Sequence, residues 1–388
     1  MKARAETCDV AVIGAGTSGV VAALAAARQG ARVALVEATD RIGGVAIHGL
    51  HRFVCGLFRT GGIRPGELLP GETTVDFCRH LAGGDPAELA VRRGRVWLLP
   101  FAGGPVLEAC ASELVAREPN IRLHMRDRAI RAVRGGDRLA EIELASGTIL
   151  TTKAAIDCTG SAALCRLAGA QVDWPAHPAL AGYGMEVCQV EESQAKPLGL
   201  SVAVPLRLRR AAEEGRLASH LAFTTWEPGR SPGRGWIKLA IPASSIPRAR
   251  TDADAVWNVL SGEPAFARAQ IVGYLPFALL RETGHLRGAY TLTGADVLAA
   301  RRFPDAIARN AWPLEQWMEG KGVSFRYLPD GECHDLAVRC LRPENGPENL
   351  FCAGAAISAD SEAAASIRVM GVCMATGEAA AWQCLDFT

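Results

Sequence analysis

The stretch from Cys8 to Glu37 constrains the fold of this chain more than any other part of the sequence. Val10 to Ile13 is a short apolar run, typical of a strand buried on both faces of a parallel sheet. Gly14, Gly16 and Gly19 follow it directly, with the spacing of a dinucleotide-binding fingerprint. In that fingerprint the first glycine allows a tight turn, the second lets the backbone approach a pyrophosphate, and the third lets the helix pack closely on the strand. The stretch therefore predicts a strand, a turn and a helix whose N-terminus faces phosphates.

The second half of this stretch adds an acid where a cofactor ribose would lie. Val20 to Arg28 predicts the helix, Gly30 ends it, and Arg32 to Val36 predicts a second strand. Glu37 closes that strand, where a carboxylate can accept hydrogen bonds from the hydroxyls of an adenosine ribose. It would repel a 2′-phosphate, so NADP is disfavoured. The alternative is a glycine turn that binds nothing. Against it, the strand, turn, helix, second strand and acid all follow one another at the spacing of the fingerprint.

Composition excludes several classes of function. Lys and Arg number 42 against 41 for Asp and Glu, a balance that predicts no nucleic-acid partner and no anionic membrane surface. The 12 cysteines include no CxxC pair, so no metal site is predicted and buried thiols in a reducing compartment are favoured. No apolar run is long enough to span a bilayer. The apolar stretch near the N-terminus resembles a signal peptide, but the glycine fingerprint within it indicates structure, and we expect a cytoplasmic protein.

A second glycine element follows the ribose acid. Arg41 precedes Gly43 and Gly44, a pair that lets another backbone loop pass close to a long ligand. This element resembles the early Arg-x-Gly-Gly of the glutathione-reductase-like, two-dinucleotide-binding-domain flavoproteins, whose cofactor is FAD. The resemblance implies that the residues just after the pair lie near the isoalloxazine. His48 or His51 would then touch flavin or substrate, although a structural histidine remains the alternative for each.

The elements predicted next follow the order of that fold. They are a helix over 105–117, a strand over 121–125, meander strands over 129–133, 139–144 and 148–150, and a strand over 153–157. Cys158, Thr159 and Gly160 close the last strand. The resemblance implies that this order returns the chain to the adenine half of the cofactor.

The character of the chain changes from about Gln171. Strands predicted over 183–190, 201–207 and 235–241 are spaced as in an antiparallel sheet, which indicates an inserted substrate or cap domain. No second GxGxxG with a following helix pattern occurs, so we expect no separate NAD(P)H domain.

The last third of the chain carries a second resemblance. Leu280-Arg281-Glu282-Thr283, Tyr290-Thr291-Leu292-Thr293 and the Arg-Arg-Phe-Pro-Asp-Ala-Ile run over 301–307 resemble, in that order, motifs of the FAD-dependent oxidoreductase family. Thr293 with Asp296 predicts a helix cap. The resemblance extends over about residues 8–60, 105–170 and 275–383.

The C-terminal end completes that second resemblance. Asn349 to Gly354 predicts a buried strand ending in glycine, and Ser366 to Met370 opens a helix over 371–383. The resemblance implies that this glycine lies by the ribityl and pyrophosphate and that the helix N-terminus faces the flavin. A hydrophobic terminal helix without a ligand is the alternative. Two positions depart from the family pattern, Ala355 in place of a common arginine and Leu336-Ala337-Val338 in place of Ile-Pro-Tyr.

Together these observations predict an α/β fold, with a Rossmann-like FAD-binding domain of parallel sheet and antiparallel meander, and an inserted α+β substrate or cap domain. The predicted FAD-binding domain comprises 1–60, 105–170 and 331–388, and the cap comprises 61–104 and 171–330. The candidate cofactor-binding residues are Ile13, Gly14, Ala15, Gly16, Thr17, Ser18, Gly19, Glu37, Ala38, Arg41, Gly43, Gly44, Ala129, Ile130, Cys158, Thr159, Gly160, Gly354, Ile367, Arg368, Val369 and Met370.

The predicted activity is an FAD-dependent oxidoreductase that takes a hydride or two electrons from a small organic substrate, with O2 or another acceptor reoxidising the flavin. Candidate catalytic residues are Arg281 as an anion or polar-substrate clamp, Glu282 as its orienting partner or a base, Arg368 as an electrostatic stabiliser of reduced flavin, and His48. Arg281 and Glu282 equally fit a buried structural ion pair. A flavin monooxygenase, or a flavoprotein subunit that relays electrons to or matures a partner protein, remains open. Oxygen incorporation with NAD(P)H consumption would indicate the first, and co-elution with a partner the second.

Overall fold

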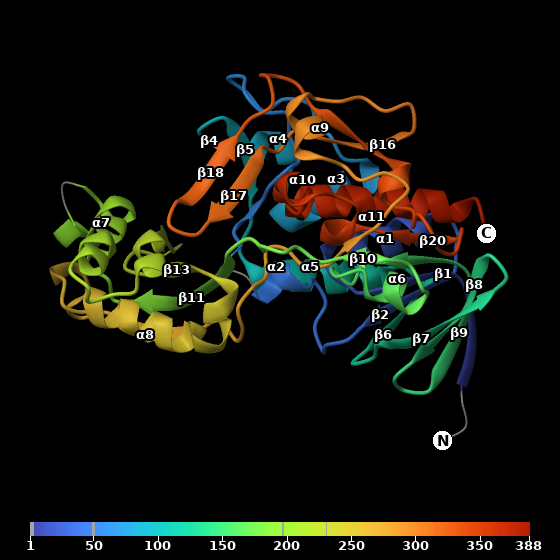
Figure 1. The fold of residues 1–388 in the computed structure, drawn as a ribbon, viewed down its shortest axis with the longest axis horizontal. Coiled ribbons are helices and arrows are strands. Elements are labelled where there is room, and N and C mark those ends of the chain that lie inside the picture. Colours follow the sequence, from blue (N-terminus) through green and yellow to red (C-terminus); the bar gives the residue numbers. More distant parts are fainter. Residues whose placement is uncertain (1–3, 49–50, 196–197, 230) are drawn as a thin grey trace.

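A mixed sheet organises the larger of two lobes of the protein (Figure 1). The structure is a computed structural model and describes residues 4–48, 51–195, 198–229 and 231–388. The sheet has the order β6-β2-β1-β9-β8-β7, and β20 also pairs with β9. Its strands are β1 (Arg4–Ile13), β2 (Val33–Glu37), β6 (Ile121–Met125), β7 (Ala129–Gly135), β8 (Arg138–Leu144), β9 (Thr148–Asp157) and β20 (Leu350–Cys352). The predicted α/β class, with a parallel sheet and an antiparallel meander, is confirmed.

The register of the parallel strands brings their carboxyl ends to one edge of the sheet. Ile13 at the end of β1 pairs with Val36 of β2 on one side and with Asp157 of β9 on the other. Glu37 in turn pairs with Met125 of β6. Ligands of open α/β sheets bind outside the carboxyl ends of the strands. This edge is therefore where the fold positions a site.

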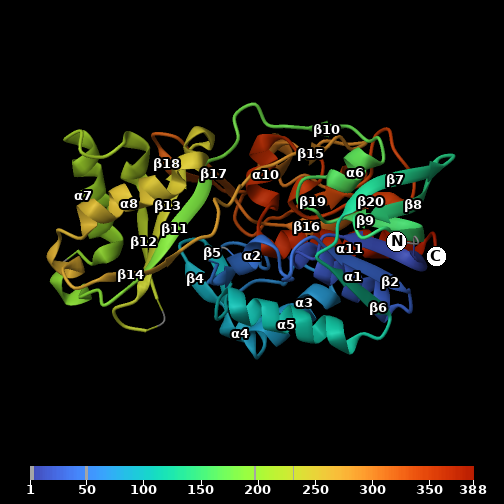
Figure 2. The same ribbon diagram turned by 90° about the horizontal axis from the view of Figure 1, so that it is seen from below.

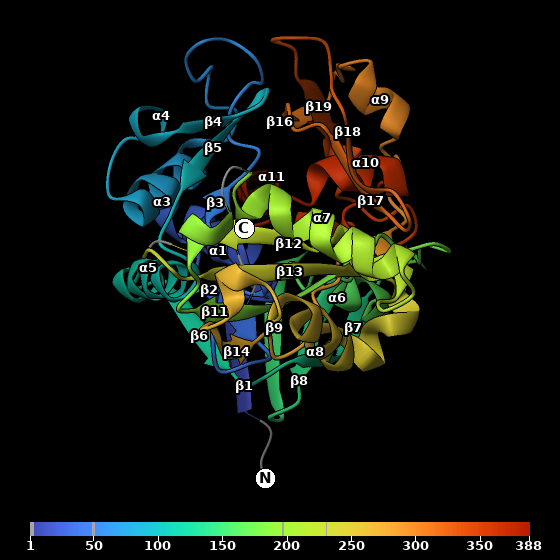
Figure 3. The same cartoon turned by 90° about the vertical axis from the view of Figure 1, so that its left-hand side faces the viewer.

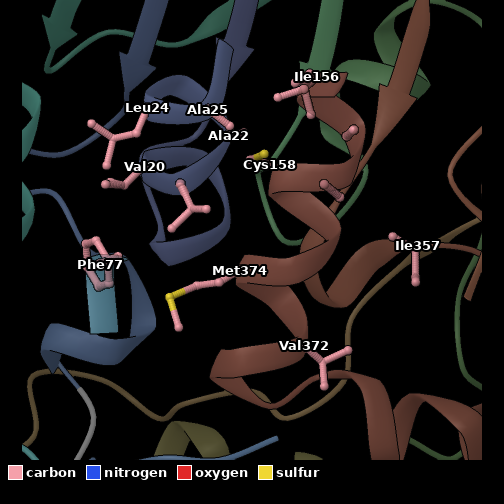
Figure 4. Packing of buried hydrophobic residues seen from close by; sticks show 14 of the residues in the cluster. Val20, Ala22, Leu24, Ala25, Phe77, Ile156, Cys158, Ile357, Val372 and Met374 are labelled. Atoms are coloured by element: carbon pink, nitrogen blue, oxygen red, sulfur yellow. The ribbon is translucent and has the colours of Figure 1, made fainter. Parts of the chain in front are cut away.

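Two helices pack closely against the central strands. α1 (Thr17–Arg28) is buried from Thr17 to Ala27 and lies beside α11 (Met370–Leu385). A Cβ atom at Gly377 of α11 would overlap the carbonyl oxygen of Ser18 and come 2.9 Å from its Oγ. Figure 4 shows side chains of α1, α11 and the neighbouring helix α3 (Glu72–Ala82) in this core. Glycine at this position thus lets the two helices approach within backbone contact.

A buried carboxylate on α11 caps the neighbouring helix α3. Glu378 is 4 % exposed, and its carboxylate accepts hydrogen bonds from the Thr73 and Thr74 amides at 2.9 and 3.0 Å. It also accepts one from Thr74 Oγ1 at 2.7 Å. The residue before α3 is Gly71, which has no side chain with which to cap the helix. A carboxylate at a helix N-terminus satisfies free amides and complements the helix dipole. Glu378 thus links α3 to α11.

The smaller lobe is an antiparallel sheet with helices on its outer face (Figures 2 and 3). The sheet has the order β12-β13-β11-β14. Its strands and helices are β11 (Ala181–Cys188), β12 (Thr225–Pro228), β13 (Gly235–Ile241), β14 (Gln270–Tyr274), α7 (Leu200–Glu213) and α8 (Ala249–Leu260). Alternation along β13 buries Ile237, Leu239 and Ile241 in a core shared with α7 and α8. Trp236 and Lys238 therefore lie on the opposite face of the sheet.

One predicted element in this lobe is wrong. Residues 201–207, predicted as a strand, belong to helix α7. The buried residues of α7 are Leu200, Val204, Leu208 and Ala211, a helical spacing that places one apolar stripe against the sheet. Only Val204 of these four residues falls within 201–207, so the predicted segment is too short to show the helical spacing of the apolar residues.

The remaining elements connect the two lobes or cover the larger one. The helices are α2 (Val45–His48), α4 (Pro86–Leu89), α5 (Gly104–Arg117), α6 (Ala163–Leu167), α9 (Gly294–Leu298) and α10 (Ser361–Ile367). The strands are β3 (Phe53–Val54), β4 (Val91–Arg93), β5 (Val96–Pro100), β10 (Val172–Asp173), β15 (His285–Leu286), β16 (Ala306–Asn310), β17 (Leu314–Met318), β18 (Gly322–Arg326) and β19 (His334–Ala337). Among the described residues, none of these helices has both the length and the apolar character to cross a bilayer.

The buried cores divide the chain differently from the predicted domains. The core of the smaller lobe comprises residues from Ala181 to Leu275. Phe77 and Leu99, from the predicted cap segment 61–104, pack instead in the core of the larger lobe. Leu292 and Phe303, from the predicted cap segment 171–330, pack there as well. The hairpin of β17 and β18 lies between the lobes in Figures 1 and 2, and the Leu180 amide donates to the Trp317 carbonyl at 3.3 Å.

Candidate active site

A cavity of about 1020 Å³ extends from the carboxyl edge of the parallel sheet to the polar face of the smaller lobe's sheet. Residues from both lobes and from the connecting strand β17 line it. We call its two ends the fingerprint end, at Gly14, Gly16 and Glu37, and the distal chamber. The distal chamber is lined by His51, Gly182, Glu227, Lys238, Arg281, Glu315, Trp317 and Arg368. One continuous space therefore joins a glycine-rich turn to a cluster of charged side chains.

The fingerprint turn requires its glycines for three separate reasons. Gly14 has a φ of +99°, and a Cβ there would come 2.5 Å from the Cys158 carbonyl oxygen. A Cβ at Gly19 would overlap the Gly14 carbonyl oxygen, so this glycine permits close helix packing. At Gly16, in contrast, the only atom of the described residues within 4 Å of an added Cβ is Gly44 Cα, at 4.0 Å. Gly16 also lines the cavity, so its missing side chain leaves room for a ligand.

The N-terminus of α1 is available to an anion. Gly16 is the N-cap of this helix, and no side chain in the described part of the chain accepts hydrogen bonds from the first-turn amides. Thr17 and Ser18 line the cavity directly after it. Uncapped amides and the positive end of the helix dipole attract phosphate groups. The turn can therefore hold a pyrophosphate.

Glu37 is fixed in place by the backbone. Its Oε2 accepts a hydrogen bond from the Ala15 amide at 2.9 Å, and its Oε1 accepts from the Thr39 amide at 2.8 Å and Thr39 Oγ1 at 2.9 Å. The side chain is 8 % exposed and lines the cavity. Oε2 retains the capacity to accept a further hydrogen bond, as from a ribose hydroxyl.

The second glycine loop folds back on the first. The Gly43 amide donates to the Ala15 carbonyl at 2.7 Å, and Gly44 has a φ of +58°. A Cβ at Gly44 would come 2.9 Å from Gly16 Cα, so the two loops meet backbone to backbone. Arg41 stands outside the cavity, where its Nε donates to both carboxylate oxygens of Glu108 at 2.9 and 3.0 Å. The loop is thereby anchored to α5.

Ion pairs and hydrogen bonds organise the distal chamber. Lys238 on β13 pairs with Glu227 on the adjacent strand β12. Glu315 accepts hydrogen bonds from Trp317 Nε1 at 2.7 Å and from Trp312 Nε1 at 3.2 Å. Arg368 donates to the Glu315 carbonyl at 3.0 Å and lies 3.7 Å from its carboxylate.

Burial and neighbouring charges shift the ionisation of these groups. Burial, with the positive charges of Lys238, Arg281 and Arg368, lowers the pKa of His51 to about 4, so its imidazole is neutral at pH 7. Burial also lowers the pKa of Lys238, against the opposing effect of Glu227. The pKa of Arg281 falls to about 9 through burial and the nearby Arg368, with Glu315 opposing the shift. The chamber therefore concentrates positive charge in a partly desolvated space.

The structure brings most of the predicted site residues to the cavity. Those that line it are Ile13, Gly14, Gly16, Thr17, Ser18, Glu37, Ala38, Gly43, Gly44, Ala129, Ile130, Cys158, Thr159, Gly160, Gly354, Arg281, Arg368, Val369 and Met370. Those that do not are Ala15, Gly19, Arg41, His48, Glu282 and Ile367. Ala15 and Gly19 still shape the turn through the contacts above, and Ile367 is buried in the core.

Two predicted catalytic residues lie elsewhere. The His48 ring packs against Phe277 with centroids 5.2 Å apart, whereas His51 lines the chamber. Glu282 does not meet Arg281. Its carboxylate is buried, accepts a hydrogen bond from the Ala179 amide at 3.2 Å, and lies 3.6 Å from His285 Nε2. These contacts stabilise the junction between the lobes.

Several chamber residues were missed by the sequence analysis. They are His51, which was named but not chosen, and Glu227, Lys238, Glu315 and Trp317. A lysine within the apolar strand over 235–241 was the one available signal, because such a residue needs a partner or a ligand. Within the described part of the chain, no group of His, Cys, Asp or Glu side chains is arranged to hold a metal ion.

The residues at both ends fit an extended dinucleotide cofactor. The fingerprint end supplies amides for a pyrophosphate, an acceptor for a ribose and open space at Gly16. Gly354, with a φ of +80°, lies beside the first turn of α1, because a Cβ there would come 3.3 Å from the Ser18 side chain. Gly354 and the first residue of α11, Met370, both line the cavity. The cavity continues beyond them into the charged chamber, where a second molecule can bind.

Comparison with known proteins identifies a family for this chain. The model of the family described as FAD dependent oxidoreductase matches residues 9–385. Among solved structures, a geranylgeranyl bacteriochlorophyll reductase-like protein from Thermoplasma acidophilum has 12% identity and a TM-score of 0.49, over 99% of this chain and 78% of that one. Glycine oxidase from Bacillus cereus has 11% identity and a TM-score of 0.48, over 98% and 96%. The p-nitrophenol 4-monooxygenase from Pseudomonas putida has 15% identity and a TM-score of 0.42, over 74% and 70%.

Proposed function

Because the chain belongs to the FAD dependent oxidoreductase family and FAD is its cofactor, we propose that it oxidises a small organic substrate held in the distal chamber. The observation that carries this proposal is the single cavity that joins the fingerprint turn to the charged chamber. When bound, FAD supplies the capacity to accept a hydride or two electrons. The protein supplies the binding, orientation and electrostatics.

The chain's own residues divide this work along the cavity. The turn at Gly14 and Gly16 with the N-terminus of α1 holds the pyrophosphate, and Glu37 binds the ribose. In the first turn of α11 the Gly371 amide donates to the Cys55 carbonyl at 2.8 Å, and the helix presents its positive dipole end to the cavity, where it favours negative charge. The polar face of the smaller lobe's sheet, with the paired Glu227 and Lys238, forms one side of the chamber.

The type of cofactor lobe, the natural partner and the cellular location are part of the same proposal. The order of helix, sheet, meander and strand supports a cofactor lobe of the glutathione-reductase-like type. The natural partner we propose is a small molecule, and a cytoplasmic location remains a prediction from composition and cysteine usage.

Removing the ribose acid should weaken FAD binding without unfolding the protein. Hydrogen bonds to a charged group contribute about 1.5–3 kcal/mol, so Glu37→Ala should lower FAD affinity by about 10- to 100-fold. Glu37→Gln keeps an accepting oxygen and should lose less. Titrating apoprotein with FAD and following quenching of flavin fluorescence measures both constants. If Glu37→Ala and the wild type bind FAD with equal affinity, Glu37 does not contribute to FAD binding.

Anaerobic reduction by candidate substrates tests the proposed function. The FAD-loaded protein is mixed without NAD(P)H with organic acids, amines, alcohols and aromatic compounds, and the visible absorption of oxidised flavin is followed. Saturable bleaching by a member of these classes supports the proposal. If the flavin is instead reduced only when NAD(P)H is added, and a parallel assay in air shows substrate-stimulated oxygen incorporation, the protein is a monooxygenase. No reduction together with co-elution of a partner protein would replace the proposal with an electron-relay subunit.

A further inference from the structure

Arg281 is the one chamber cation whose described contacts include no carboxylate. Its Nη1 donates to the Leu180 carbonyl, and its guanidinium lies over the Trp317 ring, 4.1 Å from the centroid. Within the described ranges no salt bridge involves it. A guanidinium has five N–H donors, so most of those on Arg281 are unused. They border the cavity.

The other charges of the chamber are already engaged with one another. Glu227 pairs with Lys238, while Glu315 receives two indole N–H groups and lies beside Arg368. His51 is neutral at pH 7. Among the described residues of the chamber, three cations thus face two carboxylates, which leaves one positive charge uncompensated. That charge is on Arg281.

The backbone opposite Arg281 keeps the approach to its donors open. Gly182 on β11 lines the chamber, and a Cβ atom there would lie 3.5 Å from Arg281 Nη2. Burial and the neighbouring Arg368 disfavour the charged guanidinium, as its lowered pKa indicates. An anion bound at this position would relieve both effects, since an opposite charge stabilises a desolvated cation. Stacking on Trp317 holds the planar guanidinium of Arg281, with its fork of N–H donors, in one orientation.

We propose that the substrate of this chamber is an organic carboxylate, and that Arg281 receives its carboxylate group. The inference rests on the proposed function, because it names the substrate class of the same chamber. An arginine fork matches both oxygens of a carboxylate. A singly charged carboxylate balances the one uncompensated charge, whereas a phosphate monoester would bring about two negative charges. Phe53 and Leu279, which also line the cavity, provide apolar surface for the rest of the molecule.

Binding of matched probes tests this inference independently of turnover. Oxidised FAD-loaded protein is titrated with benzoate and acetate, and with the neutral isosteres benzamide and acetamide, while flavin absorption and tryptophan fluorescence are followed. Loss of a charge-assisted hydrogen bond weakens binding by about 10- to 100-fold. We therefore expect at least one acid to bind tighter than its amide by about that factor. Acids that bind no tighter than their amides would overturn the proposal.

Variants locate the binding group. Arg281→Met should abolish the preference for acid over amide. Arg281→Lys keeps the positive charge but loses the planar pair of N–H donors, and should reduce the ratio of acid to amide affinity by about tenfold. The control Arg287→Lys alters an exposed arginine paired with Asp173 and should change nothing. An unchanged acid preference in Arg281→Met would refute the assignment to this residue. If a variant fails to fold, the ratio of acid to amide affinity measured for the wild-type protein still tests whether the chamber binds carboxylates.

The same titrations separate this inference from the proposed function. Carboxylates that bind through Arg281 but, like all other compounds, never reduce the flavin would support the anion site and reject the oxidation. Flavin reduced by a neutral amine or alcohol, with no carboxylate bound, would support the oxidation and reject the anion site.

Discussion

Gly16→Val should give a folded protein that retains no FAD. The backbone at Gly16 has φ −64° and ψ 177°, a conformation that any residue adopts. An added Cβ would meet only Gly44 Cα, at 4.0 Å, so the protein itself tolerates the valine. Its methyl groups would instead fill the space in which the pyrophosphate approaches the backbone. Purified variant should be colourless, with an apoprotein melting temperature equal to that of the wild type.

A matched control separates blocking of the site from general damage. Gly273→Val introduces the same side chain on β14, where no heavy atom of the described ranges lies within 4 Å of the added Cβ and a strand accommodates β-branching. It should be as yellow as the wild type. A Gly16→Val protein that keeps stoichiometric FAD would show that the cofactor lies somewhere other than the fingerprint turn.

Gly377→Ala should destabilise the protein although alanine is the better helix former. The substitution gains about 1 kcal/mol of helix propensity. The new Cβ, however, would overlap the Ser18 carbonyl, and backbone cannot move aside as a flexible side chain can. Overpacking typically costs about 1–3 kcal/mol, so with direct backbone overlap we expect a net loss of about 2 kcal/mol. Because Ser18 belongs to the first turn of α1, FAD affinity should fall as well.

Chemical denaturation of apoprotein and FAD titration measure the two effects of Gly377→Ala. Gln383→Ala, a change near the end of the same helix, is the control and should alter stability little. If Gly377→Ala is more stable than the wild type, the gain in helix propensity outweighs the cost of overpacking at this position. The close packing of α1 on α11 would then not be what the glycine provides.

The fingerprint end could be predicted because its determinants are local. A strand, three glycines, a helix and an acid follow one another within a short stretch, and each has its own physical requirement. The structure shows those requirements as the positive φ of Gly14, the close packing of Gly19 and the anchored carboxylate of Glu37. The capping box of Thr293 and Asp296 was predicted in the same way and is confirmed.

The distal chamber could be predicted only in part because it is assembled from distant elements. Arg281 and Arg368 were chosen from motifs, but Lys238 and Glu315 come from β13 and β17, whose relative placement no local pattern determines. The choice of His48 over His51 failed for a similar reason. The two lie three positions apart, and only the packing of His48 against Phe277 distinguishes them.

The most direct test of the account is an experimental structure of the FAD-loaded protein with a bound organic carboxylate such as benzoate. The account predicts the adenosine ribose at Glu37, the pyrophosphate at Gly16 and the N-terminus of α1, the flavin ring toward the distal chamber, and the carboxylate on Arg281. FAD in the reverse orientation, or a carboxylate bound away from the chamber while Arg281 still stacks on Trp317 without it, would contradict the account.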